Sequence, residues 1–266
     1  MKIYVNERPF EASEGEKIAS IRDKVNPRAD LLILNGFPAA EDHKLSGGDR
    51  LSIIERGVVP PIEEIEAMIG ARHTPGLRER LRGARVGIAG VGGLGSNVAL
   101  ALTRVGVGTL VLADFDVVEP SNLGRQQFFT DQIGMEKTSA LAETLGRAHP
   151  GVALELHPVR VTPENIDEIF GGCSVVVEAF DRAEEKTMLV EVLLKEHPDV
   201  TIVAASGVAG SYSTEGLKIH RVGERFYVVG DLESEARPFQ GLMAPRVGAA
   251  GHIQANLVLR VLLGEL

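Results

Sequence analysis

A glycine-rich segment at residues 90–96, which reads Gly-Val-Gly-Gly-Leu-Gly-Ser, is the part of the sequence best suited to chemistry. It follows an apolar stretch at 86–89 that is typical of a buried strand, and a helical pattern comes directly after it. Glycines at such a junction allow a tight turn and let the backbone approach a phosphate, while the helix start offers unpaired N–H groups. The spacing of Gly90, Gly92 and Gly95 therefore predicts a nucleotide-binding loop.

An acid follows this loop at the distance that a nucleotide site requires. The next apolar stretch, residues 109–113, ends at Asp114, about 20 residues further on, where dinucleotide-binding folds hold a ribose hydroxyl. Strand, loop, helix, strand and acid together predict nucleotide binding. They do not choose between a nicotinamide cofactor and ATP.

The residues after Asp114 favour a polyphosphate. They present an amide, a guanidinium and a second amide, and an arginine suits phosphate oxygens because its planar fork donates two hydrogen bonds at once. A lysine then begins a helical pattern, and an acid ends a later strand at the ligand edge of the sheet. That acid is a candidate Mg²⁺ ligand, since Mg²⁺ takes few carboxylates together with phosphate oxygens and water. These residues are Asn122, Arg125, Gln126, Lys137 and Asp181.

The elements that would position these residues alternate between strands and helices. This order predicts an α/β domain with a Rossmann-like, doubly wound, mainly parallel sheet and helices on both faces. The expected strands are 86–89, 109–113, 153–159, 174–179 and 200–205, and the expected helices are 96–105, 137–148, 164–170, 184–196 and 249–263. Residues 231–245, which follow Gly230 and contain Gly241 and two prolines, are expected to form a mobile surface loop.

The first 57 residues have the pattern of a separate, small α+β domain. Two short strands around a polar turn, one helix and two further strands follow in that order, which suggests a β-grasp, ubiquitin-like fold. Pro60 and Pro61 then stiffen the chain. We expect a β-grasp domain at 1–57, a linker with helices at 58–84, and the nucleotide-binding domain at 85–266.

Composition limits the classes of protein that remain. With 44% hydrophobic and 24% charged residues, the chain has the balance of a folded protein. The net charge of -9 argues against a nucleic-acid partner, and no apolar run approaches the roughly 20 residues of a membrane span. The single cysteine, Cys173, can form neither an internal disulfide nor a cysteine-rich zinc site. We expect a cytoplasmic protein in which Cys173 is a buried structural thiol.

Taken together, the motifs resemble the ThiF/MoeB/HesA family, which are ATP-dependent activators of ubiquitin-like sulfur carriers. The glycine loop, Asp114 and the residues that follow it match family motifs in order, and the β-grasp pattern makes the likeness closest to thiamine-pathway ThiF proteins, here with a fused ThiS-like domain. The residues that this resemblance assigns to ATP are Gly90, Gly92, Gly93, Gly95, Asp114, Asp116, Ser121, Asn122, Arg125, Gln126 and Lys137. It assigns Asp181 to Mg²⁺.

The resemblance implies an adenylyltransferase. The C-terminal glycine carboxylate of a ThiS-like carrier with a Gly-Gly end would attack the ATP α-phosphorus and release pyrophosphate, for thiazole formation in thiamine biosynthesis. Catalysis would fall to Arg125, Lys137 and Asp181, together with Arg72, which would reach the ATP of a partner subunit. Either Arg78 or Arg80 could serve in place of Arg72. The resemblance also implies a homodimer and a separate sulfur donor of the cysteine desulfurase type.

The sequence departs from the family at informative places. It has no paired Cys-x-x-Cys motifs, so we expect no zinc, and Cys173 lies on the wrong side of Asp181 for a thioester or persulfide step. Arg182 stands where the family often has asparagine, and the chain runs on past Gly57, so the β-grasp domain has no free Gly-Gly carboxylate.

Three alternatives stay open at this stage. An NAD-dependent oxidoreductase could use the same glycine loop. A member of the same family could activate a different carrier, a peptide or a tRNA-linked carboxylate. A non-catalytic protein could use its β-grasp domain as a built-in mimic of a carrier.

Overall fold

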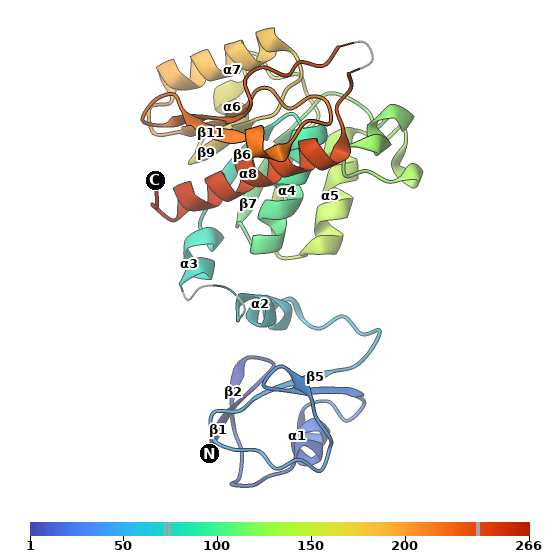
Figure 1. The fold of residues 1–266 in the computed structure, drawn as a ribbon. Coiled ribbons are helices and arrows are strands. Elements are labelled where there is room, and N and C mark those ends of the chain that lie inside the picture. The colour runs from blue at the N-terminus through green and yellow to red at the C-terminus, as the bar shows by residue number, and fades with distance from the viewer. Residues whose placement is uncertain (72, 74–75, 238–239) are drawn as a thin grey trace. The chain divides into compact units, whose positions relative to one another are not determined.

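A small mixed sheet and a larger, mainly parallel sheet organise the chain (Figure 1). The computed structural model describes residues 1–71, 73, 76–237 and 240–266. The chain divides into two units, Met1–Leu77 and Arg78–Leu266. Within the described ranges, none of the helices combines the length and the apolarity that crossing a membrane requires.

The first unit is a β-grasp domain. Its sheet has the strand order β2-β1-β5-β3-β4, in which β1 and β5 pair in parallel and the other neighbours are antiparallel. Helix α1 buries Ile18 and Ile21 in the core formed with this sheet. The elements are β1 (Lys2–Val5), β2 (Arg8–Glu11), α1 (Ile18–Val25), β3 (Leu31–Leu34), β4 (Phe37–Pro38), β5 (Arg50–Ile54) and α2 (Ile62–Gly70).

Helix α2 is joined to this small sheet by Asn6. The Asn6 backbone has φ +47°, a conformation that asparagine adopts more readily than most residues. Its amide Oδ1 accepts from the Ile53 N–H at 2.7 Å, and its Nδ2 donates to the Ile53 carbonyl and to Glu64 Oε1 at 3.1 and 2.6 Å. The expected connecting segment, residues 58–84, is therefore divided, with α2 in the first unit and most of α3 in the second.

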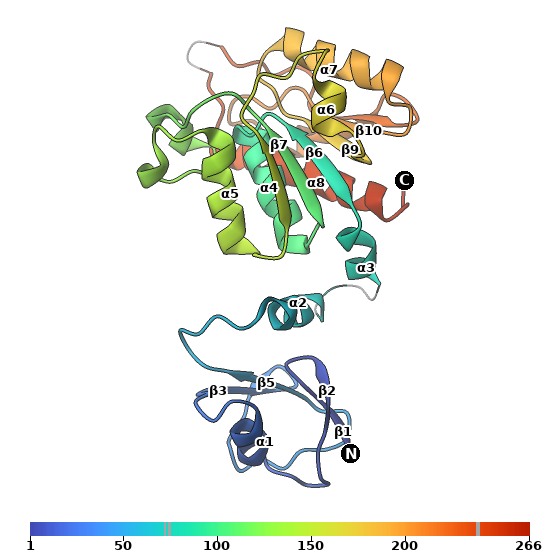
Figure 2. The same ribbon diagram turned by 180° about the vertical axis from the view of Figure 1, so that it is seen from behind.

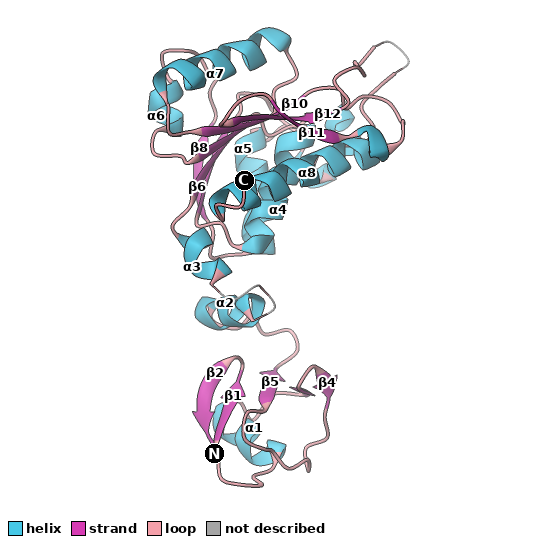
Figure 3. Cartoon of the chain, turned by 60° about the vertical axis from the view of Figure 1, so that its left-hand side comes forward, coloured by secondary structure: helices cyan, strands magenta, loops and turns pink. Residues whose placement is uncertain are grey.

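The second unit has the expected Rossmann-like architecture. Its strand order is β11-β12-β10-β9-β6-β7-β8, and all pairs are parallel except β11 with β12. Helices α4, α5 and α8 cover one face of the sheet, and α6 and α7 cover the other (Figures 2 and 3). The elements are α3 (Leu77–Arg82), β6 (Arg85–Ala89), α4 (Gly93–Val105), β7 (Thr109–Ala113), α5 (Lys137–Ala148), β8 (Ala153–His157), α6 (Ile166–Phe170), β9 (Val175–Glu178), α7 (Ala183–Glu196), β10 (Thr201–Ala205), β11 (Lys218–Arg221), β12 (Phe226–Gly230) and α8 (Ala244–Leu262).

The end of the sequence differs from the expectation at two places. Helix α8 begins at Ala244, so that Pro245 belongs to its first turn and not to the expected loop. A proline is tolerated there because the missing N–H has no partner in the first turn of a helix. Strands β11 and β12 form an antiparallel hairpin that the pattern of strands and helices did not indicate.

Arg225 holds the last turn of α7 against the sheet. Its Nη1 donates to the carbonyls of Leu193, His197 and Val200 at 3.3, 3.0 and 2.8 Å. Its Nη2 donates to the carbonyl of Leu194 at 2.6 Å. These carbonyls include groups at the helix end that have no partner within the helix, so a single guanidinium closes the α7–β10 connection.

We expect Arg225→Ala to lower the free energy of unfolding by about 2 kcal/mol, because a hydrogen bond from a charged donor contributes about 1.5–3 kcal/mol. Urea unfolding followed by circular dichroism measures this change. Arg221→Ala is the matched control, since the Arg221 guanidinium is exposed and bonds the carbonyls of Gly223 and Glu224 in its own hairpin. Equal losses in the two variants would contradict the assigned role of Arg225.

Candidate functional site

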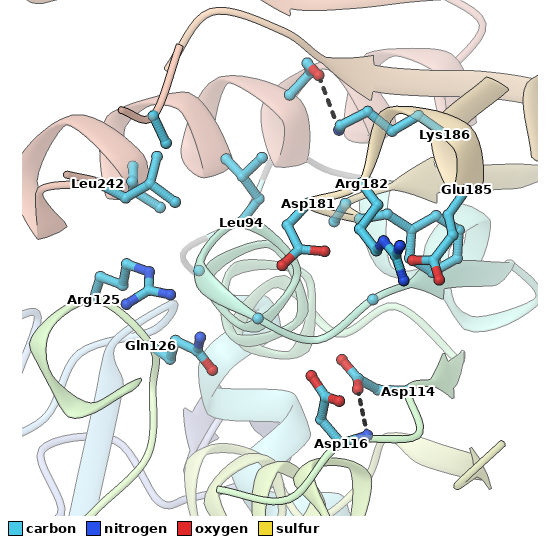
Figure 4. Close-up of a pocket in the computed structure, with 18 of the residues that line it drawn as sticks. Leu94, Asp114, Asp116, Arg125, Gln126, Asp181, Arg182, Glu185, Lys186 and Leu242 are labelled. Carbon is cyan, nitrogen blue, oxygen red and sulfur yellow. Dashed lines mark hydrogen bonds between the residues drawn. The ribbon is translucent and has the colours of Figure 1, made fainter. Parts of the chain in front are cut away.

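A cavity of about 750 Å³ lies at the carboxyl ends of the parallel strands (Figure 4). The segments that follow β6, β7, β8, β9 and β10 all line it, as expected for a doubly wound sheet. The sequence-predicted residues that line it are Gly90, Gly92, Gly93, Asp114, Asp116, Ser121, Asn122, Arg125, Gln126, Lys137 and Asp181. Gly95 lies behind the lining, in α4, and Arg72 lies outside the described residues.

The glycine loop owes its shape to two positions without a side chain. Gly90 has φ +87°, and a Cβ there would lie 2.8 Å from the carbonyl oxygen of Ala179. A Cβ on Gly95 would lie 1.9 Å from the carbonyl oxygen of Gly90, which no rearrangement of side chains could relieve. The close contact brings the first turn of α4 up to the end of β6, so its free N–H groups face the cavity edge.

Asp114 joins the end of β7 to the glycine loop. Its Oδ2 accepts from the Val91 N–H at 2.8 Å, and its Oδ1 accepts from the Asp116 N–H at 2.9 Å (Figure 4). Burial raises the pKa of this carboxyl, against the effect of these hydrogen bonds and of the Lys137 charge. Each oxygen keeps a second lone pair, so the carboxylate can also accept from a pair of ligand hydroxyls.

Lys137 is held at the cavity by Asp116. The ammonium Nζ lies 2.8 Å from Asp116 Oδ2, and the Lys137 N–H donates to the Asp116 carbonyl at 2.9 Å. Lys137 is only 7% exposed, whereas the Asp116 side chain is half exposed. An ammonium has three N–H donors, so two remain to face an anionic ligand in the cavity.

A short 3₁₀ helix, Pro120–Gly124, presents the polar side chains predicted after β7. The Asn122 amide is partly committed to this turn, because its Oδ1 accepts from the Glu119 N–H at 3.0 Å. Arg125 Nη1 donates to the Ser121 carbonyl at 3.2 Å. Two buried atoms, Arg125 Nε and Gln126 Oε1, have no hydrogen-bond partner among the described residues. Buried polar atoms of this kind are typical of a surface that receives a polar ligand.

Asp181 is an exposed carboxylate at the centre of the cavity, between Arg125 and Arg182 (Figure 4). It follows the end of β9, three residues after Glu178. Within the described part of the chain, no residue donates a hydrogen bond to its side chain. An oxygen donor without a protein partner suits a hard cation that is also held by phosphate oxygens.

A further cluster of side chains at the cavity was not predicted from the sequence. The Arg160 guanidinium lies 3.8 Å from the centre of the Phe115 ring and forms an ion pair with Glu185 of α7. All three line the cavity, as does Arg182. The rule that ligands bind at the carboxyl ends of strands indicates the segment after β8, but not which side chains meet there.

Two further loops that line the cavity are joined by Arg246. This residue of α8 is 3% exposed, and its guanidinium donates to the carbonyls of Tyr212 and Ser213 and to Asp231 Oδ2, the last at 2.6 Å. Although burial opposes it, the N–H groups of Ser234 and Glu233 and the Arg246 charge hold the pKa of Asp231 below its usual range. The loops after β10 and β12, which both line the cavity, are therefore tied to the start of α8.

Cys173 lies apart from this cavity, between α6 and β9. It is buried, and burial raises the pKa of its thiol to about 11. A thiol with a raised pKa has little of the thiolate that a covalent step requires. The geometry thus agrees with a structural role.

We expect iodoacetamide at pH 8 to leave Cys173 unmodified in the native protein, since only about 0.1% of a thiol is ionised three pH units below its pKa. The same reagent in urea should add one carbamidomethyl group, which intact-protein mass spectrometry detects. Rapid alkylation of the native protein would show that the thiol is accessible and reactive.

Comparisons with known proteins agree with both parts of this architecture. The model of the ThiF family matches residues 66–265, and the model described as ThiS-like ubiquitin matches residues 1–57. The chain is 31% identical over 191 residues to the adenylyltransferase and sulfurtransferase UBA4 of Candida glabrata, covering 70% of this chain and 44% of that protein. It is 44% identical over 94 residues to the ubiquitin-like modifier-activating enzyme 5 of Oryza sativa, covering 35% of this chain and 22% of that protein. The chain spans less than half the length of these relatives.

Solved structures share the fold of the second unit. The tRNA N6-threonylcarbamoyladenosine dehydratase TcdA of E. coli, in complex with ATP, has a TM-score of 0.69 at 20% identity, covering 78% of this chain and 98% of that chain. The E. coli MccB complex with ATP has a TM-score of 0.56 at 18% identity, covering 71% and 59%. At such identities the likeness describes the fold alone.

Proposed function

The chain belongs to the ThiF family, and on that premise we propose that it is an ATP-dependent adenylyltransferase acting on the C-terminal glycine carboxylate of a ubiquitin-like sulfur carrier. One observation carries the proposal. A single cavity holds a glycine loop at a helix start, two cationic side chains and a carboxylate that has no hydrogen-bond partner in the described part of the chain. The side chains are Arg125, Lys137 and Asp181.

In this proposal, the nucleotide lies across the edge of the sheet. Asp114 accepts from the ribose hydroxyls, because both of its oxygens keep a free lone pair beside the loop. The phosphates lie at the first turn of α4. Arg125 Nε and Gln126 Oε1 then gain the partners that they lack among the described residues.

The reaction needs no general base, since a carboxylate is already ionised at neutral pH. A carboxylate oxygen of the carrier forms a bond to the α-phosphorus, the bond from that phosphorus to the bridging oxygen breaks, and pyrophosphate leaves. The protein must align the two reactants and neutralise the charge that builds on the phosphates. Lys137, held by Asp116, and Arg125, held by the Ser121 carbonyl, are fixed cations suited to this task.

Magnesium fits the residues present. The exposed Asp181 carboxylate offers oxygen ligands, and Mg²⁺ usually combines one or two carboxylates with phosphate oxygens and water. Among the described residues, no group of three or more His, Cys, Asp or Glu side chains is arranged to hold a metal. In this proposal, phosphate oxygens and water complete the coordination around Asp181. When bound, the ion would withdraw charge from the leaving pyrophosphate.

The ThiS-like first domain supports a carrier of the thiamine pathway as the substrate. This domain cannot itself be adenylated at a terminus, because the chain continues through Gly57 into Val58. The substrate is therefore a separate chain. The proposal includes a homodimer, a cytoplasmic location and a sulfur donor of the cysteine desulfurase type, as the family resemblance implies.

Incubation with Mg-ATP and a panel of Gly-Gly-ended carriers tests the substrate. We expect mass spectrometry to detect an acyl-adenylate on a ThiS-type carrier, with pyrophosphate exchange that depends on it. Adenylation of other carriers alone, or of a tRNA-linked carboxylate, would overturn the thiamine assignment. NADH binding without any pyrophosphate exchange would overturn the assignment of the protein as an adenylyltransferase.

Replacing Asp181 tests the metal site. We expect Asp181→Ala to lower Mg²⁺-dependent ATP–pyrophosphate exchange by about 10²–10³-fold, the range for loss of one charged contact to the transition state. Asp199→Ala is the matched control, because Asp199 is an exposed aspartate outside the cavity lining. Full pyrophosphate exchange by the Asp181→Ala variant would contradict the assignment of Asp181 as a metal ligand.

A further inference from the structure

The ion pair between Glu178 and Lys186, in which the carboxylate is buried and the lysine side chain is 28% exposed, has no place in the reaction described above. Glu178, the last residue of β9, is 1% exposed. Lys186, the fourth residue of α7, places its Nζ 2.9 and 3.0 Å from the two carboxylate oxygens of Glu178. Burying the Glu178 charge costs free energy, and a well-packed apolar pair in the same place is often equally stable or more so. Stability alone therefore does not account for this pair.

Each member of the pair also forms a hydrogen bond with the backbone of a segment that lines the cavity. Glu178 Oε1 accepts from the Phe180 N–H at 2.8 Å, one residue before Asp181. Lys186 Nζ donates to the Ala205 carbonyl at 3.2 Å (Figure 4), at the end of β10 and just before the lining loop 206–209. The pair thus joins the ends of β9 and β10 to the start of α7.

Lys186 lines the cavity, but the hydrogen-bonding capacity of the pair leaves little for a ligand. An ammonium has three N–H donors, and the three contacts of Lys186 use all of them. Both oxygens of Glu178 face Lys186, and one also accepts from Phe180. Asp181, by contrast, accepts no hydrogen bond from the described residues, so its place depends on the turn that Glu178 holds.

We propose that the Glu178–Lys186 pair positions Asp181 and the loop after β10 for binding of a metal–nucleotide complex. Lys186 and Glu178 are positioning residues that act through Asp181 and touch neither the nucleotide nor the metal. This inference rests on the proposed function for the identity of the ligand. Loss of the pair weakens the metal-dependent part of ATP binding and leaves the ribose contacts of Asp114 in place.

Calorimetric titration separates these two parts of binding. ATP is titrated into the full chain with Mg²⁺ and with EDTA, and AMP is titrated with EDTA. For Glu178→Gln, which keeps the shape of the side chain, and for Lys186→Met, we expect the gain in ATP affinity from Mg²⁺ to fall about tenfold, the lower end of the range for residues that orient a metal ligand. The affinities of ATP and AMP in EDTA should stay within about twofold of wild type.

Matched variants distinguish a specific loss of Mg²⁺-dependent binding from a general loss of folding. Lys195→Met, on the same helix, removes a lysine that is 80% exposed, and it should change nothing. Lys186→Arg, which keeps a charged donor, should restore part of the Mg²⁺-dependent gain. Melting curves are recorded for every variant. A lower melting temperature with unchanged Mg²⁺-dependent binding would overturn the proposal in favour of a structural role.

A double-variant cycle tests whether the pair acts through Asp181. Adding Glu178→Gln to Asp181→Asn should cause no further loss of Mg²⁺-dependent affinity, because the group being positioned is already altered. Losses that add independently would overturn the proposal. Mg²⁺-dependent ATP binding by a wild-type protein that adenylates no carrier would overturn the proposed function alone. A wild-type protein that shows no Mg²⁺-dependent ATP binding would overturn both the proposed function and the positioning role of the Glu178–Lys186 pair.

Discussion

The close contact between the first turn of α4 and the loop after β6 is the constraint on which the whole site depends. The carbonyl oxygen of Gly90 occupies the space that a side chain on Gly95 would need. This contact allows the helix to begin at the edge of the sheet, where its N–H groups remain free. The Asp114 carboxylate then fixes the loop to β7 through the Val91 N–H. The glycine at position 95 therefore lets the helix start close to the end of β6, with its free N–H groups at the edge of the sheet.

Charged groups around the cavity fall into two classes according to their partners. The first class forms hydrogen bonds with other protein groups. Asp116 binds Lys137 in this way, and the Glu178–Lys186 pair connects the ends of β9 and β10. Asp181, by contrast, meets no donor among the described residues, and these residues also leave the buried Nε of Arg125 without a partner. Groups already in position need no reorganisation when a charged ligand arrives, which makes their electrostatic effect larger. The candidate site thus combines Asp181, which the described residues leave without a donor, with cations and loops that protein contacts hold in place.

Local patterns allowed much of this arrangement to be predicted. The glycine loop, the acid after β7 and the acid after β9 lie on short segments whose strand-to-helix order determines their position at the sheet edge. The hairpin of β11 and β12 escaped prediction, because an antiparallel edge pair added to a parallel sheet has no signal in the alternation of strands and helices. Pro245 was assigned to a loop, although a proline in the first helical turn equally marks a helix start.

The sequence by itself therefore determined the fold class, the family and the main residues of the candidate site, since these depend on backbone conformations that neighbouring residues specify. Only the tertiary structure decided which side chains support that site. The Phe115, Arg160 and Glu185 cluster joins three separate segments, and the Glu178–Lys186 pair reaches Ala205 on another strand. Contacts of this kind depend on the packing of α7 and the strand ends against one another. Packing distances between distant segments leave no periodic trace in the order of residues.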